Sequence, residues 1–171
     1  MMSKLACVPA AFLMLAGCAH GQYTSPPAST SVTIAGKKIS IQYHAPSMHG
    51  RKIFGGLEPY HKVWRAGANE ATALHTDADL TIGKLSVPKG DYTLFVSLDP
   101  AQWQLIVNKQ TGEWGLDYHQ EQDLGRVPMQ MSKPPSPINT FEITLSDAGG
   151  NRGLLKMEWE NTIASVLFTV K

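Results

Sequence analysis

The feature that most constrains the fold is a repeated alternation of apolar and polar residues with a period of two. In KKISIQYH, residues 37–44, Ile39, Ile41 and Tyr43 alternate with polar neighbours, which is the pattern of a strand with one buried face. Further short segments of this kind follow, separated by turns that contain glycine and proline. They read ADLTIG (78–83), KLSVP (84–88), YTLFVSL (92–98), WQLIVN (103–108), GRVPMQMSK (125–133), NTFEITLS (139–146), LLKMEWEN (154–161) and IASVLFTVK (163–171).

These segments predict about nine strands, with no helix of ten residues and no internal repeat. Because a single sheet would leave one apolar face in water, we expect an all-β fold, namely a two-sheet antiparallel β-sandwich with jelly-roll-like topology. A chain of 171 residues with 43% hydrophobic residues and a net charge of +1 suits one domain. Since no run of lysine or arginine could neutralise phosphates, we expect no nucleic-acid partner.

The N-terminus predicts export. Lys4 precedes the apolar run LACVPAAFLMLAG, residues 5–17, which is too short to span a bilayer but has the size of a signal-peptide core. The run ends in LAGC, residues 15–18, and this motif resembles the lipobox of bacterial lipoproteins, in which the cysteine is lipidated and becomes the first residue of the mature chain. Ordinary signal cleavage after Ala19 is the alternative.

The lipobox resemblance implies three parts of the chain. Residues 1–17 are then a lipoprotein signal peptide, residues 18–31 are lipidated Cys18 with a flexible tether, and residues 32–171 form the β-sandwich. The tether is small, polar and contains two prolines, which is typical of flexible linkers. We expect an extracytoplasmic protein of the bacterial cell envelope, held by its lipid anchor on the periplasmic side of the outer membrane, so that the membrane is its first partner.

Cysteine usage limits the chemistry. The two cysteines are Cys7, in the signal, and Cys18, so the expected mature domain offers no thiol for catalysis and no intramolecular disulfide. Any metal would have to be bound by histidine and carboxylate side chains, and we expect no cofactor.

Three long segments carry a resemblance to a known family. They are HAPSMHGRKIFGGLEPYHKVWRAGANEATALH (44–75), KLSVPKGDYTLFVSL (84–98) and LIVNKQTGEWGLDYHQEQDLGRVPMQM (105–131). They resemble the bacterial family called domain of unknown function 2911, over about residues 36 to 170. Its most specific parts are the Gly50–Arg51 pair, the block WRAGANEAT from Trp64, and PKGDYTL with the later EWG. The resemblance implies an exported all-β domain and leaves its function open.

The block WRAGANEAT is the main candidate site. In the structural interpretation, Trp64 packs at a sheet edge, Arg65 and Glu70 pair with each other or with loop carbonyls, and Asn69 takes a turn conformation. The functional interpretation is that Arg51, Arg65, Asn69 and Glu70 converge at the mouth of the sandwich and bind a small polar or anionic ligand or an envelope protein. Arginine suits a carboxylate or a phosphate, because its donors form a planar fork.

The histidines give an alternative function. His44, His75 and His119 are weak candidates for a metal site, and Asp117 would share a face with His119 if LDYH were a strand. Glu70 with one or more of these histidines and His49 could serve a hydrolase or a metal-dependent enzyme. No HExxH, GxSxG or phosphate-loop motif supports a specific reaction, so whether the protein is an enzyme stays open.

Overall fold

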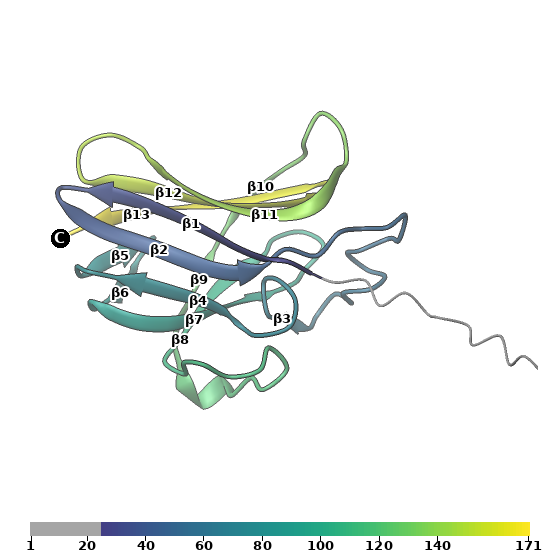
Figure 1. Ribbon diagram of the computed structural model, residues 1–171, viewed down its shortest axis with the longest axis horizontal. Helices are drawn as coiled ribbons and strands as arrows, with labels where there is room; N and C mark the ends of the chain where they lie inside the picture. The colour runs from purple at the N-terminus through teal and green to yellow at the C-terminus, as the bar shows by residue number, and fades with distance from the viewer. Residues whose placement is uncertain (1–24) are drawn as a thin grey trace, which may run out of the picture.

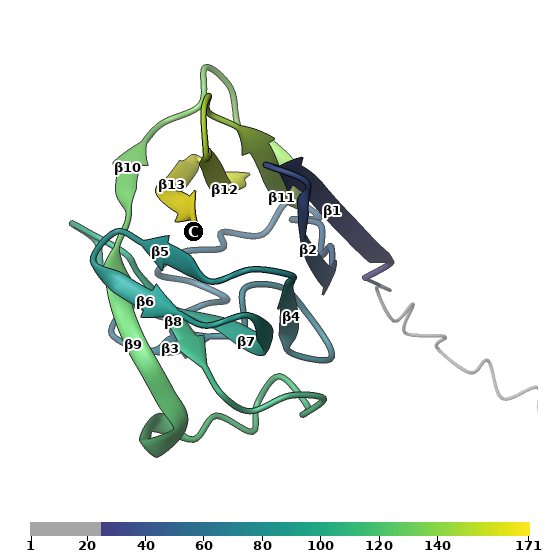
Figure 2. The same ribbon diagram turned by 90° about the vertical axis from the view of Figure 1, so that its left-hand side faces the viewer.

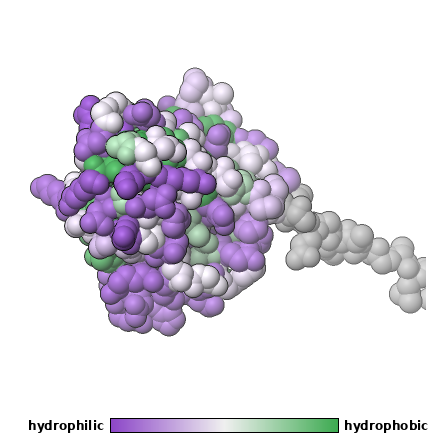
Figure 3. Space-filling view, turned by 60° about the vertical axis from the view of Figure 1, so that its left-hand side comes forward, coloured by the Kyte–Doolittle hydropathy of each residue, from purple (hydrophilic) through white to green (hydrophobic). Residues whose placement is uncertain are grey.

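The computed structural model describes residues 25–171; the predicted signal peptide, Cys18 and residues 19–24 lie outside this range. The described chain forms two antiparallel sheets that pack face to face (Figures 1 and 2). Much of the described surface that Figure 3 shows is hydrophilic, with smaller hydrophobic patches. The prediction of an all-β sandwich is therefore confirmed, while its jelly-roll-like topology stays a prediction. Within residues 25–171, no helix is long and apolar enough to cross a membrane.

The first sheet has seven strands. Its main path runs in the order β1-β2-β4-β7-β8-β9, and the short strand β3 pairs with β7. The bounds are β1 Pro27–Ile34, β2 Lys37–His44, β3 Val63–Trp64, β4 Thr72–Thr76, β7 Gly90–Ser97, β8 Gln104–Asn108 and β9 Asp123–Pro128.

The second sheet has six strands. Its main path runs in the order β11-β12-β13-β5-β6, and β10 pairs with β13. The bounds are β5 Leu80–Ile82, β6 Leu85–Val87, β10 Gln130–Ser132, β11 Ile138–Asp147, β12 Arg152–Glu160 and β13 Thr162–Val170. All the strands that the sequence predicted are present, and GRVPMQMSK contains two of them, β9 and β10.

The N-terminal strand corrects the predicted extent of the tether. β1 begins at Pro27 and pairs with β2 along its whole length, so residues 27–31 are part of the sandwich and not of a flexible linker. The strand was hidden because polar Thr30 occupies a half-buried position between Ala28 and Val32, which pack against the core, so the alternation of hydropathy is weak.

Aromatic side chains fill one end of the core between the sheets. The rings of Phe54 and Trp103 lie 4.5 Å apart, and the rings of Trp64 and Trp159 stack at 5.9 Å. Trp64 is 2% exposed, so the first residue of WRAGANEAT is part of the core. This position fixes the start of the candidate loop on the rigid part of the fold.

The outer face of the first sheet is partly covered by the β8–β9 loop, which contains the short 3-10 helix η1, Gln120–Gln122. Tyr118 of this loop packs against Phe95 at 4.9 Å between ring centroids. Its hydroxyl donates to Asp123 at 2.7 Å, and burial together with this hydrogen bond raises the pKa of Tyr118 to about 12. These contacts fix the loop to β7 and β9. The other side of the loop borders the candidate functional site.

Candidate functional site

The loop at residues 65–71 has a backbone that neither a strand nor a helix can provide. Ala66 and Asn69 adopt left-handed conformations with φ of +52° and +60°, which are uncommon for residues other than glycine. Two buried side chains hold the loop in place. The indole nitrogen of Trp64 donates to the carbonyl of Gly67 at 3.2 Å, and the hydroxyl of Thr72 donates to the carbonyl of Ala66 at 2.8 Å. These contacts explain why WRAGANEAT shows no periodicity.

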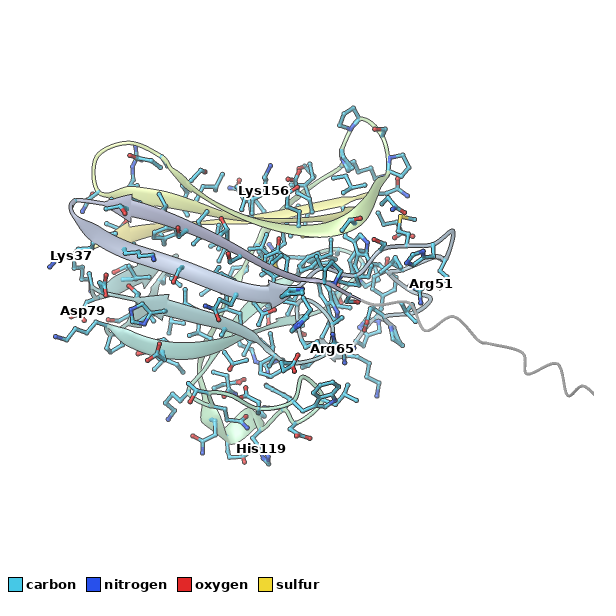
Figure 4. All side chains as sticks on the ribbon, viewed as in Figure 1. Lys37, Arg51, Arg65, Asp79, His119 and Lys156 are labelled. Atoms are coloured by element: carbon cyan, nitrogen blue, oxygen red, sulfur yellow. The ribbon has the colours of Figure 1, made fainter. Side chains whose placement is uncertain are left out.

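A second loop reaches the same end of the sandwich. The guanidinium of Arg51 donates to the carbonyls of Met48 and Ser47 at 2.9 and 2.8 Å, and so it braces its own turn. The Met48 amide donates to the carbonyl of Asn139 at 2.8 Å, which fixes this turn to β11 of the second sheet. Figure 4 shows Arg51 and Arg65 at one end of the sandwich and Lys37 at the other.

A cavity of about 260 Å³ lies between these two loops. Arg51, Arg65 and Asn69 all line it, together with Glu58 and Ser25; we call it the arginine cavity. The Nε of Arg65 is buried and has no hydrogen-bond partner. Burial raises the pKa of Glu58 above its usual value, and the charge of Arg65 opposes that rise. The cavity thus holds a cationic group with an unused donor and a carboxylate nearby.

Glu70, the fourth predicted site residue, faces a different hollow. It lines a groove of about 470 Å³ on the outer face of the first sheet, and its Oε2 lies 3.2 Å from Nδ1 of His44. Among the described residues, Glu70 thus contacts His44 and forms no ion pair with Arg65, which was one of the alternatives that the sequence left open. The structure brings three of the four predicted residues together and places Glu70 on the other side of the loop.

The predicted metal-binding histidines are not brought together. His75 contacts Asp91 at 2.7 Å and Asp77 at 3.1 Å, whereas His119 contacts Glu121 at 3.0 Å. Among residues 25–171, no three histidine, cysteine or acidic side chains are arranged to hold a metal ion. The LDYH segment is not a strand, so the condition under which Asp117 would share a face with His119 is not met.

The sequence did not single out two residues of the β8–β9 loop. Both carboxylate oxygens of Glu113 are buried without a hydrogen-bond partner, and Glu113 lines the groove that contains Glu70. Gly115 lies against the side chain of Arg65, where a Cβ would collide with the Arg65 stem. Both belong to EWG, and the pairing of PKGDYTL with EWG in the family resemblance was the available signal.

The fold and the site define a β-sandwich domain whose loops at one end enclose a small charged cavity. The chain matches the family described as Protein of unknown function (DUF2911) over residues 25–168, and it belongs to that family. Comparison with curated proteins and with solved structures found no match.

Proposed function

We propose that this domain binds a small ligand that carries a carboxylate or a phosphate, and that the ligand occupies the arginine cavity. The main observation in support of this proposal is that the Nε of Arg65 is buried and has no hydrogen-bond partner. A buried donor without an acceptor costs about 1–3 kcal/mol. An oxyanion supplies acceptors that match the planar donor fork of a guanidinium.

The other residues of the arginine cavity support the same class of ligand. Arg51 is braced by loop carbonyls, so its charge is already positioned before a ligand arrives. Glu58 offers a carboxyl group to a hydroxyl or ammonium group elsewhere on the ligand. A volume of about 260 Å³ is near the lower end of ligand pockets, which favours a small polar molecule over a partner protein.

The enzyme alternative keeps one supporting contact, the 3.2 Å approach of His44 to Glu70. A histidine next to a carboxylate is a common general base. However, His75 contacts Asp77 and Asp91 instead of joining this pair. Binding is therefore the function that the geometry supports better.

We also propose that the domain is tethered to the bacterial envelope, on the periplasmic side of the outer membrane, through lipidated Cys18. The support is the LAGC motif at residues 15–18 and the apolar run before it. Since β1 begins at Pro27, the tether shortens to residues 19–26, which at about 3.4 Å per residue reach at most about 27 Å. Ser25 lines the arginine cavity, so a lipid-anchored domain would hold this cavity close to the membrane surface.

Thermal shift and calorimetry with acetate and inorganic phosphate test the binding proposal. We expect either anion to raise the Tm of the wild-type domain, and Arg65→Met to abolish the rise, because methionine keeps part of the apolar stem and removes the donors. Arg152→Met is the matched control, since Arg152 is an exposed arginine at the start of β12. An equal response of the two variants, or no response of the wild type to either anion, would refute the proposal.

A further inference from the structure

The outer face of the first sheet carries a second hollow beside the groove of Glu70. The first hollow, of about 470 Å³, is lined by His44, Glu70 and Glu113 among others, and the second, of about 450 Å³, by His75 and Asp91 among others. Gln42 and Ala73 line both hollows. The two hollows are therefore adjacent on this face, and we call them together the acidic groove.

The pairing of the strands sets the floor and the length of the acidic groove. Gln42 of β2 pairs with Ala73 of β4, and Ser40 of β2 pairs with His75, so small and polar side chains form the outward face here. His44, at one end, is four residues from Ser40 along β2. At about 3.3 Å per residue the floor extends for roughly 13 Å. The groove therefore suits an elongated ligand.

The charge of the acidic groove is one-sided. Within residues 25–171, its lining includes the carboxylates of Glu70, Glu113 and Asp91 and no lysine or arginine. His44 contacts Glu70, and His75 contacts Asp91. Even with both imidazoles protonated, the lining of the groove as a whole keeps an excess of carboxylates, three against two.

Glu113 points most directly to a cationic occupant. Both of its carboxylate oxygens are buried without a donor, and a buried carboxylate is costly unless it is hydrogen-bonded or paired. An ammonium group offers three donors on one charged atom. In the groove it would donate to the exposed carboxylate of Glu70, and its charge would offset that of the buried Glu113 carboxylate beside it.

We propose that the acidic groove binds a linear polyamine, with one ammonium group at Glu70 beside Glu113 and another at Asp91. A ligand that extends along about 13 Å of strand must be longer than putrescine. Extended spermidine or spermine has a comparable length. The site is separate from the arginine cavity, because Glu70 lines only the groove whereas its neighbour Asn69 lines only the cavity.

Calorimetric titration of spermidine into the whole domain at low ionic strength tests the proposal. We expect saturable binding that is at least tenfold tighter than that of putrescine and that weakens at least tenfold in Glu113→Gln and in Asp91→Asn. Asp91 is exposed, so its variant keeps the test valid even if Glu113→Gln unfolds. Glu142→Gln, at an exposed carboxylate on β11 of the other sheet, should bind as the wild type does.

The outcomes separate the two proposed sites. Arg65→Met should leave spermidine binding unchanged, and Asp91→Asn should leave the phosphate response unchanged. Three results would overturn the polyamine site: no saturable heat with spermidine, binding of spermidine no tighter than that of putrescine, or a loss of affinity in Glu142→Gln as large as in Asp91→Asn. The first result would mean that spermidine does not bind, and the other two would mean that the surface attracts cations only diffusely.

Discussion

Arg65 and Gly115 are in direct contact, and the stem of the arginine fills the space that a Cβ on residue 115 would need. The amide of Gly115 donates to the carbonyl of Asn69 at 3.1 Å, and the amide of Ala71 donates to the carbonyl of Glu113 at 3.3 Å. The β8–β9 loop therefore forms a short bridge with the 65–71 loop. Because of this bridge, the orientation of the Arg65 guanidinium depends on a residue distant in the sequence.

The first prediction follows from this contact. Gly115→Ala should displace the Arg65 stem, lower the free energy of unfolding by about 1–3 kcal/mol as overpacking does, and weaken the phosphate response of the arginine cavity. Urea unfolding and calorimetry would measure the two effects. Gly149→Ala is the control, because Gly149 has open space around it and φ of +90°; it should show a backbone cost of about 1 kcal/mol and unchanged phosphate binding.

The second prediction concerns the anchor at the other end of the loop. Thr72 is fully buried and donates to the carbonyl of Ala66, so Thr72→Val should strand a buried acceptor at nearly constant volume. We expect a loss of about 1–3 kcal/mol in the free energy of unfolding. Thr33→Val, at an exposed position of β1, should change stability by no more than about 0.5 kcal/mol. Similar losses in both variants would contradict the assigned role of Thr72.

β1 and β4 were missed because threonine occupies inward-facing positions in both strands. In β4 the buried positions include Thr72 and Thr76, so the alternation of burial is not an alternation of hydropathy. Their hydroxyls are satisfied by the carbonyls of Ala66 and Ala78, which no local pattern reveals. Strands with aliphatic inward faces, such as β2 with Ile39, were predicted because burial and hydropathy coincide there.

The candidate site was predictable only in part. The density of polar residues in two loops indicated Arg51, Arg65 and Asn69, and the structure places these three around one cavity. The direction of Glu70 was not predictable, because it depends on left-handed residues whose conformation the sequence does not specify. Glu113 was missed because a lone acidic residue in a turn has no distinguishing pattern; its burial comes from long-range contacts.

The third prediction concerns pH. Hydrogen bonds that the His75 imidazole donates to the carboxylates of Asp91 and Asp77 raise its pKa above the usual value of 6.5. The protonated imidazole therefore stabilises the fold below the unfolded-state pKa of about 6.5, and this stabilisation is lost as the pH rises through the higher folded-state pKa. His75→Gln should thus be destabilised more at pH 5.5 than at pH 8.5, by no more than about 1 kcal/mol, since the pair is exposed. NMR titration of His75 giving a pKa below 6.5 would contradict this.

The fourth prediction concerns the N-terminal anchor, which lies outside the described residues. If LAGC is a lipobox, Cys18→Ala should prevent acylation and release processed protein from the membrane fraction, because acyl chains contribute about 0.8 kcal/mol per buried CH₂. Fractionation without detergent, followed by mass spectrometry of the N-terminus, would measure both effects. Cys7→Ala is the control and should leave the processed chain in the membrane fraction. Retention of processed Cys18→Ala protein would count against the anchor.

The last prediction separates architecture from function within WRAGANEAT. Arg65 is half-buried with its stem against Gly115, so Arg65→Ala removes packing and should cost about 1–3 kcal/mol. Glu70 is 59% exposed and contacts His44, so Glu70→Ala should cost no more than about 1 kcal/mol. Thermal melts would resolve the difference, because 1 kcal/mol corresponds to about 2–4 °C in a domain of this size. A Glu70→Ala protein destabilised as much as Arg65→Ala would show that Glu70 holds the fold together, and the acidic groove would then lose one of its assigned ligand contacts.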